Sequence, residues 1–168
     1  LYHYGLSKRN LMQSLISDSL KYNLKYFIFI PTILYGPNFN FGDKHFIYDI
    51  IRKVHNAKLS NTFVEMSGTP DNKRDLVYID DAIKIIFKCI NLENNIINLT
   101  SKNHQTIFFY TKLISKLMDY DVSKIIFKNY YDDGIKIRNL DDKKLNSYFK
   151  NLKKTELIKG LKSTIKYF

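Results

Sequence analysis

Tyr4 and Lys8 are the residues of this sequence whose types and spacing most directly suggest chemistry. They lie four positions apart at the start of a stretch that we expect to be helical, so their side chains leave one face, one turn apart. A lysine ammonium beside a phenol favours the phenolate, which makes such a tyrosine a better acid. The pair is therefore a candidate for proton transfer near neutral pH.

The spacing alone is a weak signal, because the chain has 13 tyrosines and the pair Tyr120 and Lys124 repeats it. The context of Tyr4 and Lys8 is stronger. The helix predicted over 7–21 is followed by an apolar run over 26–30 and then by a predicted loop with proline and glycine over 31–37. A helix that leads into a buried strand is a unit of an open α/β sheet, and such sheets bind ligands beyond the carboxyl ends of their strands.

Hydrophobic periodicity and turn residues predict alternating helices and strands along the rest of the chain. Asp80 is the expected N-cap of the third helix. The alternation predicts the α/β class. We expect helices over 7–21, 46–55, 80–90, 105–118, 141–149 and 155–168, strands over 25–30, 63–66, 76–79, 96–99 and 122–127, a loop over 67–74 and an irregular segment over 130–140.

Composition narrows the classes of function. The chain has 168 residues, a length typical of a single domain. It is 45% hydrophobic and has a formal net charge of +11. The lysines are scattered, whereas a nucleic-acid footprint needs basic residues clustered on one face. The sequence has no stretch of about 20 consecutive apolar residues, so no membrane-spanning helix is predicted. The single cysteine, Cys89, is expected to be a buried apolar residue in a reducing, cytoplasmic setting, and no His or Cys spacing indicates a metal site.

Arginine is rare in this chain, which has four arginines among 27 basic residues. Its planar guanidinium grips phosphate with two hydrogen bonds, which lysine cannot do. Each of the four, Arg9, Arg52, Arg74 and Arg138, is therefore worth inspecting as a contact for a phosphate-containing ligand.

The order of motifs, Tyr4-Gly5-Leu6-Ser7-Lys8 followed by the segment 31–37, resembles the extended short-chain dehydrogenase/reductase superfamily of nucleotide-sugar epimerases, dehydratases and reductases. Within it the chain is most similar to the GDP-L-fucose synthases. This resemblance implies the C-terminal part of a Rossmann-like doubly wound sheet, with 1–37 and 82–118 in the sheet domain. Residues 38–81 and 119–168 would form a small α/β substrate-binding lobe.

The resemblance covers only the later half of that family's chain. The first residue is Leu1. The family's glycine-rich phosphate-binding turn, its catalytic Ser/Thr and the Cys that serves as general base would precede it. We therefore expect the sequence to be a fragment that is inactive alone.

The same resemblance assigns roles to particular residues. Tyr4 would give a proton to the substrate carbonyl oxygen, and Lys8 would orient the nicotinamide ribose. His45 lies in a match that runs to His55 and would be the acid in epimerisation, touching the cofactor. Further cofactor contacts would come from the backbone of Ile33, Leu34, Tyr35 and Gly36.

The substrate contacts implied by the resemblance are Arg52, Ser67, Arg74 and Arg138. Arg74 would grip the diphosphate. Three positions depart from the family pattern: Ile33 replaces an asparagine, Ser67 a tryptophan and Pro70 a glycine. These departures place the identity of the sugar in question more than the fold.

The implied function is NADPH-dependent conversion of GDP-4-keto-6-deoxy-mannose to GDP-L-fucose by a cytoplasmic homodimer, with NADP(H) as cofactor and a GDP-sugar as substrate. No nucleic-acid or membrane partner is expected. Two alternatives stay open. One is an epimerase or dehydratase of the same superfamily that acts on another nucleotide sugar with NAD. The other, less favoured, is a non-catalytic basic binding domain.

Overall fold

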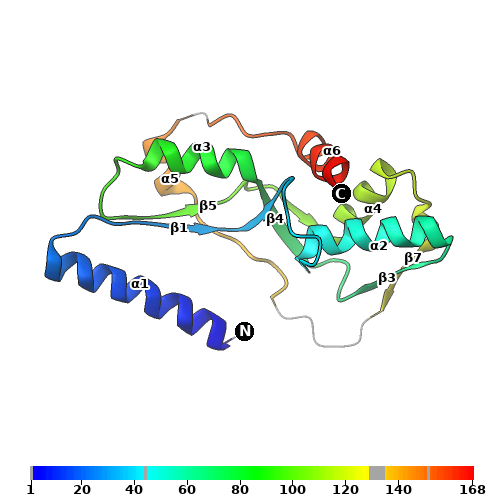
Figure 1. The fold of residues 1–168 in the computed structure, drawn as a ribbon, viewed down its shortest axis with the longest axis horizontal. Coiled ribbons are helices and arrows are strands. Elements are labelled where there is room, and N and C mark those ends of the chain that lie inside the picture. Colours follow the sequence, from blue (N-terminus) through cyan, green and yellow to red (C-terminus); the bar gives the residue numbers. More distant parts are fainter. Residues whose placement is uncertain (1, 44, 129–134, 151) are drawn as a thin grey trace.

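The computed structural model describes residues 2–43, 45–128, 135–150 and 152–168, so part of the irregular segment predicted over 130–140 lies outside the described residues. Helices and strands alternate along most of the chain, which confirms the α/β class (Figure 1). The helices are α1 (Tyr2–Tyr22), α2 (Phe46–Ser60), α3 (Ile79–Cys89), α4 (Ile107–Leu117), α5 (Lys143–Tyr148) and α6 (Leu157–Tyr167), with a 3-10 turn, η1 (Val122–Lys124). The strands are β1 (Phe27–Pro31), β2 (Ile33–Tyr35), β3 (Val64–Ser67), β4 (Lys73–Tyr78), β5 (Asn95–Leu99), β6 (His104–Thr106) and β7 (Ile125–Lys128).

Most strand pairs are parallel, as expected when helices connect the strands. β1 pairs with β5, β2 with β4, and β3 with β7, all in parallel. β6 adds an antiparallel neighbour to the other side of β4. At the bend between β1 and β2, the amide of Thr32 donates to the carbonyl of Leu99 at 2.9 Å. This bend moves the chain from the edge of β5 to the edge of β4.

Two hydrophobic clusters hold these elements together, and β4 contributes to both. Leu76 and Tyr78 belong to a larger cluster built on α2, α4 and α6, whereas Val77 belongs to a smaller one built on α3, β1 and β5. Because successive side chains of a strand point to opposite faces, β4 buries both of its faces. Its fixed position matters for the site, since β4 also carries Arg74 and Asp75.

The two clusters do not follow the predicted domain division at two places. Tyr110 and Ile114 of α4 pack in the cluster of α2, although α4 was assigned to the sheet domain. Leu145 of α5 packs in the cluster of β5, although α5 was assigned to the lobe. The division itself stays a prediction.

Several predicted boundaries were wrong. The segment after Pro31 forms β2 instead of a loop, β4 begins at Lys73 inside a predicted loop, and 122–124 is a 3-10 turn. Polar residues fit in β4 because pairing with β6 supplies hydrogen bonds, and no local pattern announces that pairing. Asp80 is not an N-cap. Tyr78 occupies that position, and Asp80 lies in the first turn of α3.

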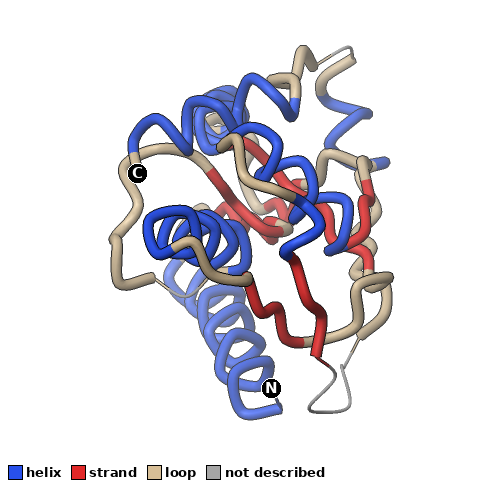
Figure 2. Tube along the Cα trace, turned by 90° about the vertical axis from the view of Figure 1, so that its right-hand side faces the viewer, coloured by secondary structure: helices blue, strands red, loops and turns tan. Residues whose placement is uncertain are grey.

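Helix α1 is long but poorly covered. Ser19 is its only buried residue among those described, and its apolar residues Leu11, Leu15 and Leu20 are exposed. In Figure 2 this helix lies at the lower left of the molecule, with the N-terminus at its lower end. None of the helices in the described part of the chain is long and apolar enough to cross a membrane.

Gly160 allows α6 to approach β2 and β4 closely. A Cβ atom at this position would collide with the hydroxyl of Tyr35 and lie 3.0 Å from Cδ2 of Tyr78. We expect Gly160→Ala to lower the free energy of unfolding by about 1–3 kcal/mol, because overpacking forces shifts in the core. Gly5→Ala is the matched control, since nothing lies within 4 Å of a Cβ there and alanine favours a helix. Urea unfolding of both variants measures the difference. A Gly160→Ala variant as stable as the parent would show that α6 is not tightly docked.

Candidate functional site

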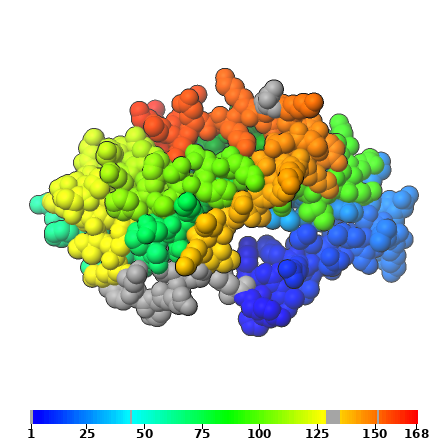
Figure 3. Space-filling model, turned by 180° about the vertical axis from the view of Figure 1, so that it is seen from behind, coloured from blue at the N-terminus to red at the C-terminus, as the bar shows by residue number. Residues whose placement is uncertain are grey.

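A cavity of about 580 Å³ lies where the first turn of α1, the β1–β2 bend, the start of α2 and β4 converge. Figure 3 shows the surface hollowed between the first turns of α1, in dark blue, and the segment after residue 134, in orange. Among the residues that the sequence singled out, four with ionisable side chains line this one cavity, although they come from four separate segments. They are Tyr4, His45, Arg74 and Arg138.

Tyr4 enters the cavity from the first turn of α1 with its phenol accessible, since the residue is 67% exposed. The Nζ atom of Lys8 lies 5.6 Å from the centre of the Tyr4 ring, which places the cation over the ring face. The two side chains therefore share one helix face, as their spacing predicts. Ser7 donates from its hydroxyl to the carbonyl of Tyr4 at 2.8 Å.

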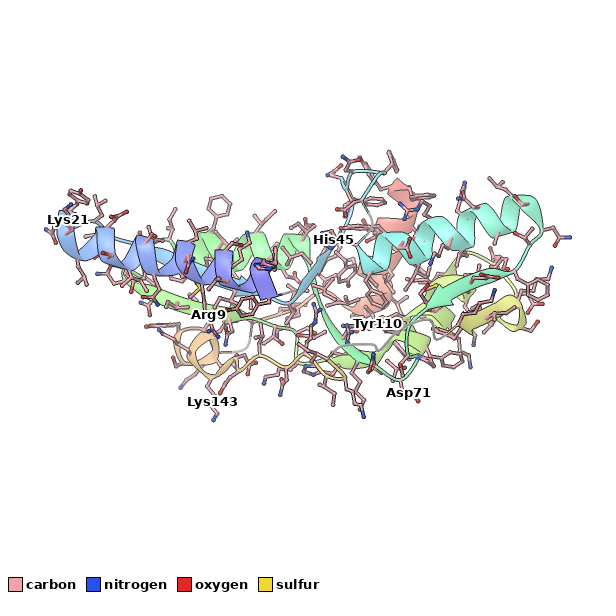
Figure 4. All side chains as sticks on the ribbon, turned by 90° about the horizontal axis from the view of Figure 1, so that it is seen from below. Arg9, Lys21, His45, Asp71, Tyr110 and Lys143 are labelled. Atoms are coloured by element: carbon pink, nitrogen blue, oxygen red, sulfur yellow. The ribbon has the colours of Figure 1, made fainter. Side chains whose placement is uncertain are left out.

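His45 occupies the N-cap position of α2, with extended backbone angles. Its amide donates to Oδ1 of Asp43 at 3.1 Å, and its Nε2 lies 3.7 Å from the same oxygen. The imidazole is 73% exposed, so it is accessible to a ligand. In Figure 4 His45 lies at the start of α2, beside the N-terminal end of α1.

Arg74 and Arg138 approach the cavity from β4 and from the segment after residue 134. Arg74 donates from Nη1 to the carbonyls of Lys73 at 2.7 Å and Ile135 at 3.1 Å. The buried Tyr110, labelled in Figure 4, donates to the Arg74 carbonyl at 3.0 Å. The carbonyl of Arg138 accepts from Nε2 of His104 at 3.1 Å. The backbone at both arginines is thus tied to neighbouring elements.

The other predicted site residues are placed differently. Ile33 and Leu34 line the cavity, whereas Lys8, Tyr35, Gly36, Arg52 and Ser67 are not among its lining residues in the described part of the chain. Arg52 instead contacts the turn before His45, and Ser67 is exposed at the end of β3. Gly36 has φ of 157°, and a Cβ there would collide with the side chain of Ile79, which explains the glycine.

Asp43, Tyr48 and Asp75 are among the polar residues of the cavity wall that sequence reasoning missed. Asp75 is buried and accepts hydrogen bonds from the amide of Ser101 at 3.0 Å and from the hydroxyls of Thr100 and Ser101. Its position beside Arg74 was the available signal. Burial and the nearby Asp43 carboxylate raise the pKa of Tyr48, so this phenol stays protonated at neutral pH.

A second, smaller cavity of about 210 Å³ is lined by Tyr35 and Tyr110. Burial is the main cause that raises the pKa of both phenols above the ordinary value, with Asp81 contributing at Tyr35 and Asp75 at Tyr110. The unfolded chain therefore loses these protons first as the pH rises. We expect the free energy of unfolding to decline above about pH 10, and a Tyr110→Phe variant to decline less steeply. Urea midpoints of both proteins, measured at about pH 8 and at about pH 11, test this. An equal fall of the midpoint in both proteins between the two pH values would contradict it.

The sequence profile of the NAD dependent epimerase/dehydratase family matches residues 1–100. The chain belongs to this family. It is 26% identical over 171 residues to the GDP-L-fucose synthase of Dictyostelium discoideum, a match that covers 98% of this chain and 53% of that protein. It is 30% identical over 146 residues to the GDP-L-colitose synthase of Yersinia pseudotuberculosis, which covers 83% of this chain and 46% of that protein. This chain therefore spans about half the length of the curated relatives it matches.

Solved structures give the same fold. The UDP-glucose 4-epimerase of Thermotoga maritima, solved with UDP-glucose, superposes with a TM-score of 0.84 at 24% identity, over 98% of this chain and 52% of that one. A GDP-L-fucose synthetase from Naegleria fowleri bound to NADP superposes with a TM-score of 0.77 at 20% identity, over 83% and 45% of the two chains. The parallel strands of this family member are thus part of a Rossmann-like architecture.

Proposed function

We propose that this chain forms the C-terminal half of an NADP-dependent nucleotide-sugar epimerase/reductase that converts GDP-4-keto-6-deoxy-mannose to GDP-L-fucose. The observation that carries the proposal is the convergence of Tyr4, His45, Arg74 and Arg138 on one cavity. The relatives named GDP-L-fucose synthase and GDP-L-colitose synthase support a GDP-sugar as substrate. In this proposal the 168 residues hold half of the active site and need the half that precedes them for activity.

The wall of the cavity fits a nicotinamide ring beside a sugar. Ile30, Ile33 and Leu34 supply apolar surface, and Tyr4 and His45, whose side chains can transfer protons, line the same cavity. A nicotinamide cofactor bound there supplies the hydride, and the protein supplies position and electrostatics. Lys8 would hold the nicotinamide ribose from the face of α1 that it shares with Tyr4.

The roles that we propose for the chain's own residues combine the family resemblance with their places in or near the cavity. Arg74 and Arg138 neutralise the charge of the diphosphate and fix the sugar against the cavity wall. His45 gives a proton to the carbon that is epimerised beside the ketone. The hydroxyl of Tyr4 gives its proton to the ketone oxygen as negative charge develops on it, and Lys8 stabilises the phenolate that remains. Lys8, Ile33, Leu34, Tyr35, Gly36 and His45 remain the proposed cofactor contacts, and Ser67, Arg74 and Arg138 the proposed substrate contacts, whereas the side chain of Arg52 is directed to the turn before His45.

A second candidate is an epimerase or dehydratase for another nucleotide sugar with NAD. The exposed Ser67, in place of the family's tryptophan, and the apolar Ile33 at the cavity wall favour it. Both candidates use Tyr4 and Lys8 in the same way. We also propose that the protein is a homodimer.

The test is turnover by the complete polypeptide that the reading frame encodes. With NADPH and GDP-4-keto-6-deoxy-mannose, we expect GDP-L-fucose and a matching loss of NADPH absorbance. UDP-glucose, UDP-galactose and GDP-mannose, each with NAD or NADPH, are the parallel arms. Turnover of a UDP-sugar without turnover of GDP-4-keto-6-deoxy-mannose would favour the second candidate. A protein that turns over none of these substrates but binds DNA in a salt-dependent manner would favour a basic binding domain.

A further inference from the structure

Arg52 was expected to contact the substrate, but its side chain is directed to the turn before His45. Nη1 of Arg52 donates to the carbonyls of Asp43 at 3.1 Å and Phe41 at 3.4 Å. Nη2 donates to Oδ1 of Asp49 at 2.6 Å, one turn earlier on α2. The side chain is only 27% exposed, so most of its surface is already covered by these contacts. The guanidinium therefore joins α2 to the 40–43 turn.

The 40–43 turn has a defined shape of its own. The amide of Asp43 donates to the carbonyl of Asn40 at 2.8 Å, and the amide of Gly42 donates to Oδ1 of Asn40 at 2.9 Å. Arg52 donates to the carbonyls of Phe41 and Asp43 at the end of this turn. The turn and the helix together fix where the Asp43 carboxylate lies.

That carboxylate faces His45. Oδ1 of Asp43 accepts from the His45 amide at 3.1 Å and lies 3.7 Å from its Nε2, and both residues line the larger cavity. The first contact fixes the backbone at the N-cap of α2. The second places a negative charge beside the ring that would carry the proton.

Aromatic residues support the turn from the other side. Phe39 stacks on Tyr48 with ring centres 4.0 Å apart, and Phe41 stacks on Tyr167 of α6 at 5.7 Å. Phe168 also packs against Phe39 at 6.1 Å. The segment that carries Asp43 is thus held by α2 through Arg52 and Tyr48, and by the C-terminal end of α6 through Tyr167.

We propose that Arg52 and Asp43 are positioning residues, with Arg52 fixing the 40–43 turn and Asp43 orienting His45 for proton transfer. Arg52 then acts through His45 and not through the diphosphate. The inference rests on the proposed function for the role of His45, but the arrangement of Arg52, Asp43 and the turn stands without it.

The test compares Arg52→Lys with Lys53→Gln in the complete protein. Lys53 is the matched control, because it lies next in α2 and pairs with the same Asp49, at 3.0 Å, with no bond to the turn among the described contacts. We expect Arg52→Lys to speed amide exchange at Gly42, Asp43 and His45 by about tenfold or more, and Lys53→Gln to leave it unchanged. We also expect kcat to fall about tenfold for Arg52→Lys while the Kd for GDP stays within about twofold.

Asp43 is tested by two substitutions. Asp43→Asn keeps an oxygen for the His45 amide but removes the charge, so we expect normal amide exchange at His45 with kcat reduced about tenfold. Asp43→Ala removes both, and exchange at His45 should rise as well. Asp43→Glu should recover part of the activity.

Two results would overturn the inference. A rise of about tenfold or more in the Kd for GDP, with unchanged exchange in the turn, would make Arg52 a ligand contact. Faster exchange in Lys53→Gln equal to that in Arg52→Lys would mean that any loss of charge loosens α2. Amide exchange needs no substrate, so failure of the proposed function, seen as absent turnover in the parent protein, is distinguishable from failure of this arrangement.

Discussion

Replacing Tyr4 by phenylalanine should reduce kcat of the complete enzyme by about 10²–10⁴-fold, the range that a positioned proton donor contributes. The substitution removes one hydroxyl from a residue that is 67% exposed. The stability of the fold should therefore be unchanged. The Kd for the nucleotide sugar should also be unchanged, because the arginines and not the phenol are expected to hold the diphosphate.

Tyr2→Phe is the matched control for Tyr4→Phe. Tyr2 lies in the same turn of α1 and is 76% exposed, but it is not among the lining residues of the larger cavity. Steady-state turnover with a fixed nucleotide sugar measures both variants. Equal activities of Tyr4→Phe and the parent would remove Tyr4 from the proposed chemistry, whatever the activity of the control.

The second large effect concerns stability. Asp75 is 1% exposed and accepts one amide and two hydroxyl hydrogen bonds from Thr100 and Ser101. Asp75→Ala leaves these donors without an acceptor in a buried position. Hydrogen bonds to charged groups are the stronger ones, so we expect a loss of about 3 kcal/mol in the free energy of unfolding.

Urea unfolding measures this loss, and Asp71→Ala is the control because Asp71 is an exposed residue just before the same strand. Asp75 ties β4 to the segment that follows β5, so its loss should also disturb the neighbouring Arg74. A change below about 0.5 kcal/mol would contradict this view, because it would place the Asp75 contacts among ordinary surface interactions.

The elements that the sequence predicts correctly are those with a local cause. The apolar run at 27–30 forms β1, and the spacing of Ile50, Ile51 and Val54 forms the buried face of α2. β6 has no apolar pattern, since it consists of His104, Gln105 and Thr106 and exists through its pairing with β4. A strand made by a distant partner cannot be read from its own residues.

The same distinction applies to the site. Tyr4, His45, Arg74 and Arg138 stand out by residue type and motif, and the fold brings them to one cavity. The buried role of Asp75 depends on partners 25 and 26 residues away, which no spacing rule relates to it. The motif around Arg52 predicts a ligand contact, but its guanidinium instead donates to backbone carbonyls of the turn at 40–43.

The measurement that tests the central claim most directly is a crystal structure of the complete protein with GDP-mannose. We predict that diphosphate oxygens lie about 3 Å from the guanidinium of Arg74, with the sugar between the hydroxyl of Tyr4 and the imidazole of His45. A nucleotide sugar bound outside this cavity, or with its sugar ring turned away from both Tyr4 and His45, would contradict it.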